Sequence, residues 1–332
     1  MIAPAASVRS AVARWLEAGT LSGVWPDALA RVHAGFASRG IARPLSVPRG
    51  VEVVTVGGAT LGGSGKTRVA LAVARALARR GARVVLVGHA YRARPSRARV
   101  VAPDDPRAAV GDEALLCARA LGAAARVVVA PTRQAAVDFV AALVPRVDVI
   151  VIDGPLQLAP VRASLALLAV DAQAPWGAGA LPPAGDLRAP RAALLAHADL
   201  VVVVDATPGA AIVAGARIEL GALRATGRRL GLFTALARPA RLEQALLRAG
   251  LDLAIIVRAP DHGPLTPSLV RRLRTAEVDL WLATDKCAIH LATVLGDRSI
   301  AFLDGTYELS VEAERALERL ECCLEAPAFV PS

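Results

Sequence analysis

The chain has 332 residues, of which 55% are hydrophobic and 20% are charged, and its formal net charge at pH 7 is +10. This balance is typical of a globular protein with a large core, and it excludes an intrinsically disordered chain. Aromatic residues make up only 3%. The stacking surface of a single-strand nucleic-acid binder is therefore missing, and we expect no nucleic-acid partner. The surplus positive charge suits an anionic substrate or anionic lipid headgroups, although arginines that are simply solvated would also account for it.

The sequence contains no apolar stretch long enough to span a membrane. At the N-terminus Arg9 and Arg14 interrupt the apolar run, so no secretory signal is visible. We therefore expect a cytoplasmic protein. The cysteines show neither a CxxC motif nor metal-ligand spacing, and we expect them to be reduced structural thiols. They are Cys117, Cys287, Cys322 and Cys323.

The first segment of the chain, residues 1–40, carries apolar residues at helical spacing over 7–36, with an interruption at 23–26. This spacing predicts two short amphipathic helices. Such helices usually pack on a core, and the alternative is that they lie on a membrane surface.

From residue 51 onward, segments rich in β-branched residues alternate with segments of helical periodicity. The predicted strands cover 51–56, 83–87, 126–130, 147–153, 165–171 and 199–205, and the predicted helices cover 67–80, 111–121 and 133–143. The strands are apolar nearly throughout, which is typical of a parallel sheet covered by helices on both faces. We therefore predict an α/β nucleotide-binding domain over 41–213.

The composition changes near residues 208–227, and we expect a two-stranded linker over 214–236, formed by 216–223 and 230–236. A second alternation follows, with helices at 241–249, 267–276 and 286–295 and strands at 253–258, 279–283 and 299–303. This pattern predicts a smaller C-terminal α/β domain over 237–332.

The strand at 51–56 leads into a glycine-rich turn and then a helix, which is the context that a phosphate-binding loop requires. The turn reads Gly62-Gly63-Ser64-Gly65-Lys66-Thr67. Glycines let backbone amides approach phosphate oxygens, Lys66 can reach the β and γ phosphates, and Thr67 can offer a hydroxyl to Mg²⁺. Thr60 occupies the first position, where the strict pattern has glycine, but Lys66 is one of only two lysines in the chain. The sequence therefore predicts a P-loop NTPase core.

One further residue is a candidate for the chemistry. Asp153 ends a predicted strand, where a second Mg²⁺ ligand sits in such folds, although it could simply cap the following turn.

Taken in order, these segments resemble the tetraacyldisaccharide 4′-kinases of lipid A biosynthesis. The stretch 56–67, VGGATLGGSGKT, resembles the phosphate loop of that family, which also has Thr or Ser at the position of Thr60. The stretch 177–188, GAGALPPAGDLR, and the turn 260–262, PDH, are similar to two further motifs of the family. Other matches, spread over nearly the whole chain, are Gly111-Asp112-Glu113, Arg133, Asp153, Gln157 and Thr284-Asp285-Lys286.

The resemblance implies roles for individual residues. ATP and Mg²⁺ are the implied cofactors. Asp112 would activate the attacking sugar hydroxyl with help from His262, Lys66 would act in catalysis, and Thr67 and Asp153 would hold the metal. Without the resemblance, capping at the start of a helix would explain Asp112. A lone histidine such as His262 is ordinarily a packed or hydrogen-bonded surface residue. Arg188 and Gln157 would contact the lipid substrate. The triphosphate would be bound by Thr60, Gly62, Gly63, Ser64, Gly65, Lys66 and Thr67.

The implied activity is an ATP-dependent phosphorylation of the 4′-hydroxyl of tetraacyldisaccharide 1-phosphate, a lipid A precursor. The resemblance also implies a monomer that works as a peripheral protein on the cytoplasmic face of the inner membrane. The family segment DDG-x-QH is altered, because Gly154, Pro155 and Leu158 replace its second Asp, its glycine and its histidine. A second hypothesis is therefore a divergent homologue that binds ATP but has lost activity or uses another acceptor.

A third hypothesis is a nucleotide-switch GTPase or a metallochaperone with a similar loop. That class needs a guanine-reading motif of the form (N/T)KxD. The nearest string, 284–287 (TDKC), lacks the aspartate, so this hypothesis ranks last.

Overall fold

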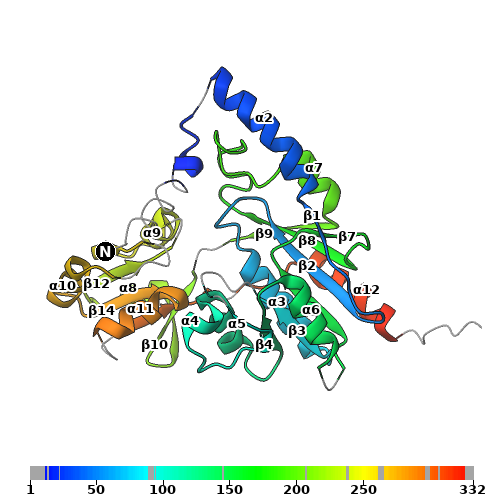
Figure 1. The fold of residues 1–332 in the computed structure, drawn as a ribbon. Helices are drawn as coiled ribbons and strands as arrows, with labels where there is room; N and C mark the ends of the chain where they lie inside the picture. The colour runs from blue at the N-terminus through cyan, green and yellow to red at the C-terminus, as the bar shows by residue number, and fades with distance from the viewer. Residues whose placement is uncertain are drawn as a thin grey trace, which may run out of the picture. The chain divides into compact units, whose positions relative to one another are not determined.

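The structure is a computed structural model. It describes residues 12, 15–21, 23–88, 93, 95–143, 146–205, 208–236, 239–260, 265–295, 300–305 and 307–325. The chain divides into two compact units (Figure 1). The large unit runs from Gly19 to Val204 and resumes at Tyr307, and Asp205–Thr306 forms the body of the small unit.

The large unit is built on a seven-stranded sheet of order β4-β5-β3-β6-β2-β8-β9. All neighbouring strands are parallel except β4, which pairs antiparallel with β5. The strands are β2 (Glu52–Gly58), β3 (Val84–Val87), β4 (Arg99–Val100), β5 (Arg126–Val129), β6 (Val149–Asp153), β8 (Leu165–Asp171) and β9 (Leu200–Val204). The predicted parallel sheet is therefore confirmed, with β4 added at one edge.

Helices cover both faces of this sheet, as the continuous apolar strands predict. Because side chains alternate along a strand, Val84 and Leu86 of β3 join one core cluster while Val85 and Val87 join the other. The first cluster includes residues of α3 (Lys66–Arg79), α5 (Asp112–Leu121) and α12 (Val311–Glu325), and the second includes residues of α6 (Arg133–Ala141). The short helices α4 (Arg107–Val110) and α7 (Arg191–His197) complete the unit.

An N-terminal helix, α2 (Val24–Arg39), precedes the sheet, and it leads into β1 (Ala42–Pro44), which pairs in parallel with β7 (Gln157–Ala159). Most of α2's large apolar side chains are exposed, with Trp25 at 81% and Phe36 at 69%. Residues 15–18 are also helical, so parts of both predicted helices are present. The remainder of the first predicted helix lies outside the described residues. Within the part of the chain that the structure describes, no helix is both long and apolar enough to cross a bilayer.

The small unit contains a six-stranded sheet of order β11-β10-β15-β14-β12-β13. Its strands are β10 (Ala210–Val213), β11 (Ala216–Glu219), β12 (Leu230–Thr234), β13 (Leu253–Arg258), β14 (Leu280–Thr284) and β15 (Ile300–Leu303). Its helices are α8 (Leu220–Arg224), α9 (Pro239–Arg248), α10 (Pro267–Thr275) and α11 (Asp285–Leu295).

The domain boundaries differ from those predicted at 213, 236 and 332. The small unit begins at Asp205, so the two strands β10 and β11 belong to it. The expected two-stranded linker does not form, because β12 pairs in parallel with β13 and β14 and not with β11. Leu230 and Leu232 of β12 are buried in the core of the small unit, which explains this placement.

The last helix also departs from the prediction, because α12 belongs to the large unit and not to the C-terminal domain. Leu317 and Leu320 of α12 are buried in the same core cluster as Leu77 of α3. Glu314 of α12 also forms a 2.6 Å ion pair with Arg80, which ends α3. The amphipathic pattern of α12 indicates a packed helix but gives no information on its partner.

Candidate active site

The glycine-rich turn joins β2 to α3. Neighbouring segments pack so closely against it that some of its positions must be glycine. Gly65 has a φ of +79° and is the N-cap of α3. A Cβ atom on Gly65 would lie 2.6 Å from Cγ1 of Val204, and one on Gly58 would lie 2.1 Å from Oγ of Ser64. Because neither position has room for a side chain, the backbone of the loop stays bare and its amides remain able to face an anion.

Thr60, which replaces the first glycine of the strict motif, shapes this loop. Its side chain is buried, and its hydroxyl donates a 2.7 Å hydrogen bond to the carbonyl of Gly62. Its backbone forms a bridge with Leu187. These contacts tie the start of the loop to the 177–188 segment and give Thr60 a local structural role.

Asp153 lies at the carboxyl end of β6, directly beside the loop. The strand β6 pairs with β2 in parallel, so the ends of both strands meet at the same edge of the sheet. Lys66 Nζ lies 2.9 Å from Asp153 Oδ1, and the Thr67 hydroxyl donates a 2.7 Å hydrogen bond to Oδ2. Asp153 is only 3% exposed. A carboxylate and a hydroxyl at this distance are the hard oxygen donors that suit Mg²⁺.

Asp112 is the first residue of α5, and Gly111 occupies the N-cap position. Asp112 is therefore not the N-cap residue of α5, although its Oδ1 accepts a 3.1 Å hydrogen bond from the amide of Glu113. A carboxylate in the first turn is favoured by the helix dipole. Burial, and next the negative charge of Asp153, raise the pKa of the Cys117 thiol on α5.

His262, the predicted partner of Asp112, lies outside the described residues. The pairing of Asp112 with His262 therefore stays a prediction.

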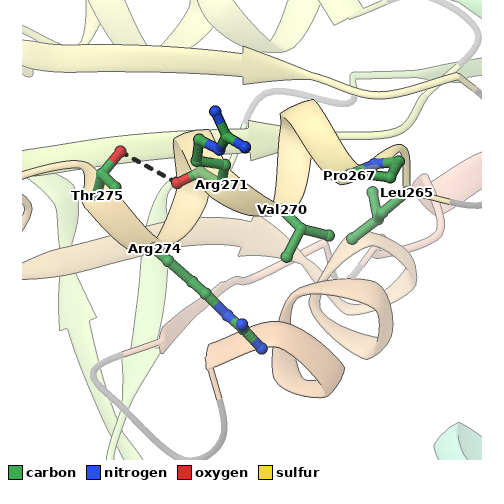
Figure 2. Close-up of a pocket in the computed structure, with 6 residues that line it drawn as sticks. All are labelled: Leu265, Pro267, Val270, Arg271, Arg274 and Thr275. Atoms are coloured by element: carbon green, nitrogen blue, oxygen red, sulfur yellow. Dashed lines mark hydrogen bonds between the residues drawn. The ribbon is translucent and has the colours of Figure 1, made fainter.

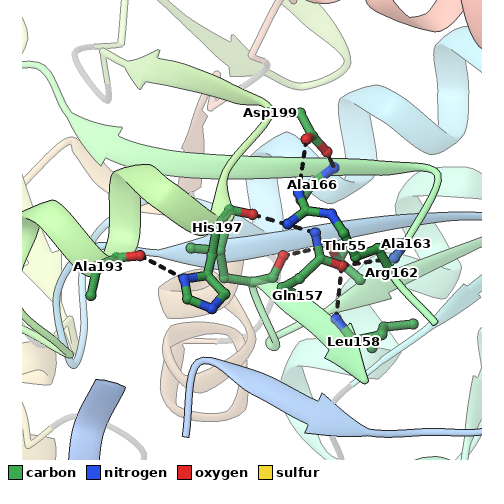
Figure 3. A network of polar contacts seen from close by, with 10 residues as sticks. Thr55, Gln157, Leu158, Arg162, Ala163, Ala166, Ala193, His197 and Asp199 are labelled. Atoms are coloured by element: carbon green, nitrogen blue, oxygen red, sulfur yellow. Dashed lines mark hydrogen bonds and ion pairs between the residues drawn. The ribbon is translucent and has the colours of Figure 1, made fainter. Parts of the chain in front are cut away.

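Gln157 has a different environment from the one expected of a substrate contact. It is 1% exposed, and Figure 3 shows its amide surrounded by backbone groups. Its Oε1 accepts hydrogen bonds from the amides of Leu158 at 2.8 Å and Ala163 at 2.7 Å, and its Nε2 donates a 3.4 Å hydrogen bond to the carbonyl of His197. This arrangement favours a role in holding the turn between β7 and β8, next to the site.

Two arginines lie beside the phosphate loop. Arg188 donates a 3.4 Å hydrogen bond from Nη2 to the carbonyl of Thr60, while its buried Nε finds no partner among the described residues. Arg133 begins α6 after the N-cap Thr132, and its guanidinium lies over Gly154, where a Cβ atom would be 2.4 Å from Nη2. Burial, the largest cause, lowers the pKa of both arginines, and the Asp153 carboxylate opposes this shift.

Sequence reasoning did not place Arg133 in the site. The feature of the sequence that could have indicated Arg133 is Gly154. A glycine in place of an acidic residue beside Asp153 leaves space for a guanidinium group.

A shallow pocket occurs in the small unit, along α10 (Figure 2). Its lining residues are Leu265, Pro267, Val270, Arg271, Arg274 and Thr275. None of the residues predicted for the site lies in it. Inside this helix Thr275 donates a 3.0 Å hydrogen bond to the carbonyl of Arg271.

A parallel sheet with a phosphate loop at the carboxyl end of β2 and a carboxylate at the end of the adjacent strand defines a P-loop protein that binds a nucleoside triphosphate. A family model described as tetraacyldisaccharide-1-P 4′-kinase matches residues 21–325. The chain belongs to this family.

Individual relatives agree with this assignment. The chain is 34% identical over 318 residues to a tetraacyldisaccharide 4′-kinase from Anaeromyxobacter sp. (strain K), covering 85% of this chain and 83% of the relative. It is 36% identical over 277 residues to one from Methylorubrum extorquens (strain PA1), covering 79% and 83%. The fold is similar to a crystal structure of the "apo" form of the Aquifex aeolicus protein in complex with ATP, with a TM-score of 0.64 at 19% identity, covering 94% of this chain and 99% of the other.

Proposed function

We propose that this protein transfers the γ-phosphoryl group of ATP to the 4′-hydroxyl of a tetraacyldisaccharide 1-phosphate in lipid A biosynthesis. The observation that carries the proposal is the convergence of Lys66 and Thr67 on the buried carboxylate of Asp153, in a chain that belongs to the 4′-kinase family. Phosphoryl transfer requires mainly positioning and charge neutralisation from the protein, and this arrangement offers both.

Each part of the site has a defined task in this proposal. The bare backbone of the loop cradles the triphosphate, Thr60 holds the loop in shape, and Lys66 neutralises charge on the β and γ phosphates. Thr67 and Asp153 would hold Mg²⁺, which supplies a positive charge that shields the phosphate oxygens. Asp112, assisted by His262, removes the proton of the sugar hydroxyl.

The helix α2 is proposed to hold the enzyme on the cytoplasmic face of the inner membrane. Its exposed apolar residues Trp25, Leu29, Val32 and Phe36 recur at helical spacing. Arg31 and Arg39 add positive charge on the same helix. An amphipathic helix of this kind binds at the lipid surface, with its apolar side chains among the acyl chains and its cations near anionic headgroups. The proposed state is a monomer.

Membrane binding is tested by cosedimentation with vesicles that contain anionic phospholipid. Replacing Trp25 and Phe36 with serine is expected to weaken binding about 10- to 100-fold, because each change removes a large apolar side chain from the bilayer. Unchanged binding would remove α2 from the proposal.

The activity is tested by incubating purified protein with ATP, Mg²⁺ and detergent-dispersed tetraacyldisaccharide 1-phosphate. The expected result is one added phosphate on the lipid, with the product lost in Lys66→Ala and Asp112→Ala. If ATP binds but the lipid is not phosphorylated, the second hypothesis holds, and the altered segment at Gly154, Pro155 and Leu158 marks a divergent homologue.

A further inference from the structure

The strand β2 carries one polar side chain, Thr55, in the middle of the apolar core. It is 0% exposed, and its neighbours Val54 and Val56 belong to the apolar core cluster around α3. We infer that Thr55 is a positioning residue for the metal site. Its hydroxyl fixes the turn that follows Asp153 and thereby holds the Asp153 carboxylate in place. The inference rests on the proposed function, in which Asp153 holds Mg²⁺.

The hydroxyl of Thr55 contacts the chain three residues beyond Asp153. Its Oγ1 donates a 2.7 Å hydrogen bond to the carbonyl of Leu156, and this hydrogen bond is buried. A buried carbonyl that lost this donor would be unsatisfied, which is costly. The hydrogen bond therefore ties the turn 154–156 to β2, the strand that leads into the phosphate loop.

Gly57 provides a second contact to the same residue. Because side chains alternate along a strand, positions 55 and 57 of β2 face the same side of the sheet. A Cβ atom on Gly57 would lie 2.6 Å from Cβ of Leu156, so Leu156 packs directly on the bare backbone there. Two same-face positions of β2 thus hold Leu156, Thr55 through a hydrogen bond and Gly57 through close packing.

The turn between Asp153 and Leu156 is short, so its anchor acts on Asp153. Asp153 is in register with Val56, and the amide of Gly154 donates a 3.0 Å hydrogen bond to the carbonyl of Val56. Gly154 has a φ of +135°, which lets the chain turn away from the sheet immediately after Asp153. Gly154 and Pro155 alone separate Asp153 from Leu156, so a displacement of Leu156 reaches the carboxylate through two residues.

Contacts on the far side of the turn begin one residue later. The amide of Gln157 donates a 3.4 Å hydrogen bond to the carbonyl of Ile41, and its side chain binds backbone groups of later residues (Figure 3). These contacts hold β7, which begins after Leu156. The shorter hydrogen bond from Thr55 therefore fixes the part of the turn that lies nearer to Asp153.

The metal site is sensitive to a small displacement of this carboxylate. Asp153 Oδ1 lies 2.9 Å from Lys66 Nζ, and Oδ2 accepts a 2.7 Å hydrogen bond from Thr67. Mg²⁺ requires nearly ideal octahedral geometry, with ligand oxygens at about 2.0–2.1 Å. A nucleotide without metal has no such requirement of Asp153. Loss of the Thr55 hydroxyl should therefore weaken the binding of ATP with Mg²⁺ and leave the binding of ATP alone unchanged.

The test measures the dissociation constant of ATP by isothermal titration calorimetry, once with Mg²⁺ and once with a chelator. The variant is Thr55→Val, because valine has nearly the shape of threonine and lacks only the hydroxyl. Mg²⁺ should tighten ATP binding by the wild-type protein, and in Thr55→Val this enhancement should fall about 5- to 20-fold, the loss expected for one buried hydrogen bond. Mg²⁺-free binding should stay within twofold. Thr55→Ser keeps the hydroxyl and should retain the enhancement within twofold.

The matched control is Val53→Ala, which destabilises the same strand without touching the anchor. Val53 is buried two residues before Thr55, on the same face of β2 and further from the loop. Val53→Ala should lower the melting temperature by about 2–10 °C and leave the Mg²⁺ enhancement within twofold. If Val53→Ala loses as much of the enhancement as Thr55→Val, Thr55 contributes only to stability and the inference is overturned. An unchanged enhancement in Thr55→Val would also overturn it.

Turnover of the same variants separates this inference from the proposed activity. With tetraacyldisaccharide 1-phosphate as acceptor, Thr55→Val should need about 5- to 20-fold more Mg²⁺ for half-maximal rate, with the KM for the acceptor within twofold. If the calorimetric results are as expected but the wild-type protein phosphorylates no lipid, the proposed function fails and the positioning role stands. If Mg²⁺ does not tighten ATP binding by the wild-type protein, the positioning role fails whatever the activity.

Discussion

The contact between Asp153 and the phosphate loop allows a quantitative prediction for Asp153→Asn. The substitution keeps the size of the side chain but removes its charge and one of its two acceptor oxygens. Asp153 now accepts one hydrogen bond from Lys66 and one from Thr67, and it is almost fully buried. In the amide, one of these two oxygens is replaced by an NH2 donor, so either the Thr67 hydroxyl or the Lys66 ammonium loses the acceptor that it now has.

The size of the effect follows from these two contacts. A hydrogen bond to a charged group contributes about 1.5–3 kcal/mol, and one full contact together with the charge of the other is lost. The net loss of about 2–4 kcal/mol corresponds to a fall of about 30- to 1000-fold in kcat at saturating Mg²⁺ and ATP. The same change frees Lys66 from its ion pair, so ATP should bind at least as tightly as before when Mg²⁺ is absent.

The assay is therefore done twice, as turnover with Mg²⁺ and as equilibrium ATP binding with a chelator present. Asp153→Asn should separate the two measurements, with slow turnover and undiminished Mg²⁺-free binding. If turnover stays within threefold of the wild-type value, Asp153 does not act in the metal site. If ATP binding without Mg²⁺ falls in parallel with turnover, Asp153 serves only to hold the loop together.

Two further predictions concern stability. Gly57→Ala would place a Cβ atom 2.6 Å from Cβ of Leu156. This overpacking should cost about 1–3 kcal/mol and lower the melting temperature by about 2–10 °C. Gly35→Ala is the control and should not lower it, because nothing lies within 4 Å of the added Cβ atom. Equal melting temperatures for the two variants would contradict the packing argument. The Arg83 guanidinium, through its hydrogen bond, holds the pKa of Asp148 below its ordinary value, so Asp148 stabilises the fold above about pH 4 and loses this effect as the pH falls further. Asp148→Asn should therefore melt at a lower temperature than the wild type at pH 7, and the difference should shrink below pH 4; a difference that is constant with pH would refute this.

The predictable part of the fold is the part that local physics determines. The strands of the large unit are apolar on both faces, and the glycine-rich turn has a fixed structural context, so the parallel sheet and the loop at its edge follow directly from the sequence. Asp153 could be predicted because a parallel partner strand must end at the same edge. These elements depend on neighbours in sequence or on one rule of sheet geometry.

Other features depend on contacts between distant segments. The partner of α12 could not be inferred, because an amphipathic pattern describes a buried face and not the surface that covers it. The strand β12 was assigned to a linker for a similar reason, since its central place in the small sheet depends on β13 and β14, which follow it in the chain. The place of Arg133 in the site could not be inferred from local pattern, because its guanidinium reaches the site only through the fold, where it lies over Gly154.

The return of α12 to the large unit means that the small unit is an insertion within another domain. Cutting the chain at residue 205 would not yield an intact nucleotide-binding half, because it would strip α3 of the apolar residues of α12. The hydroxyl of Tyr307 donates a 3.0 Å hydrogen bond to the carbonyl of Val203, so the two points where the chain leaves and re-enters the large unit lie close together. Joining residue 204 to 307 through a few glycines would therefore excise the insertion and leave a continuous domain that contains the phosphate loop.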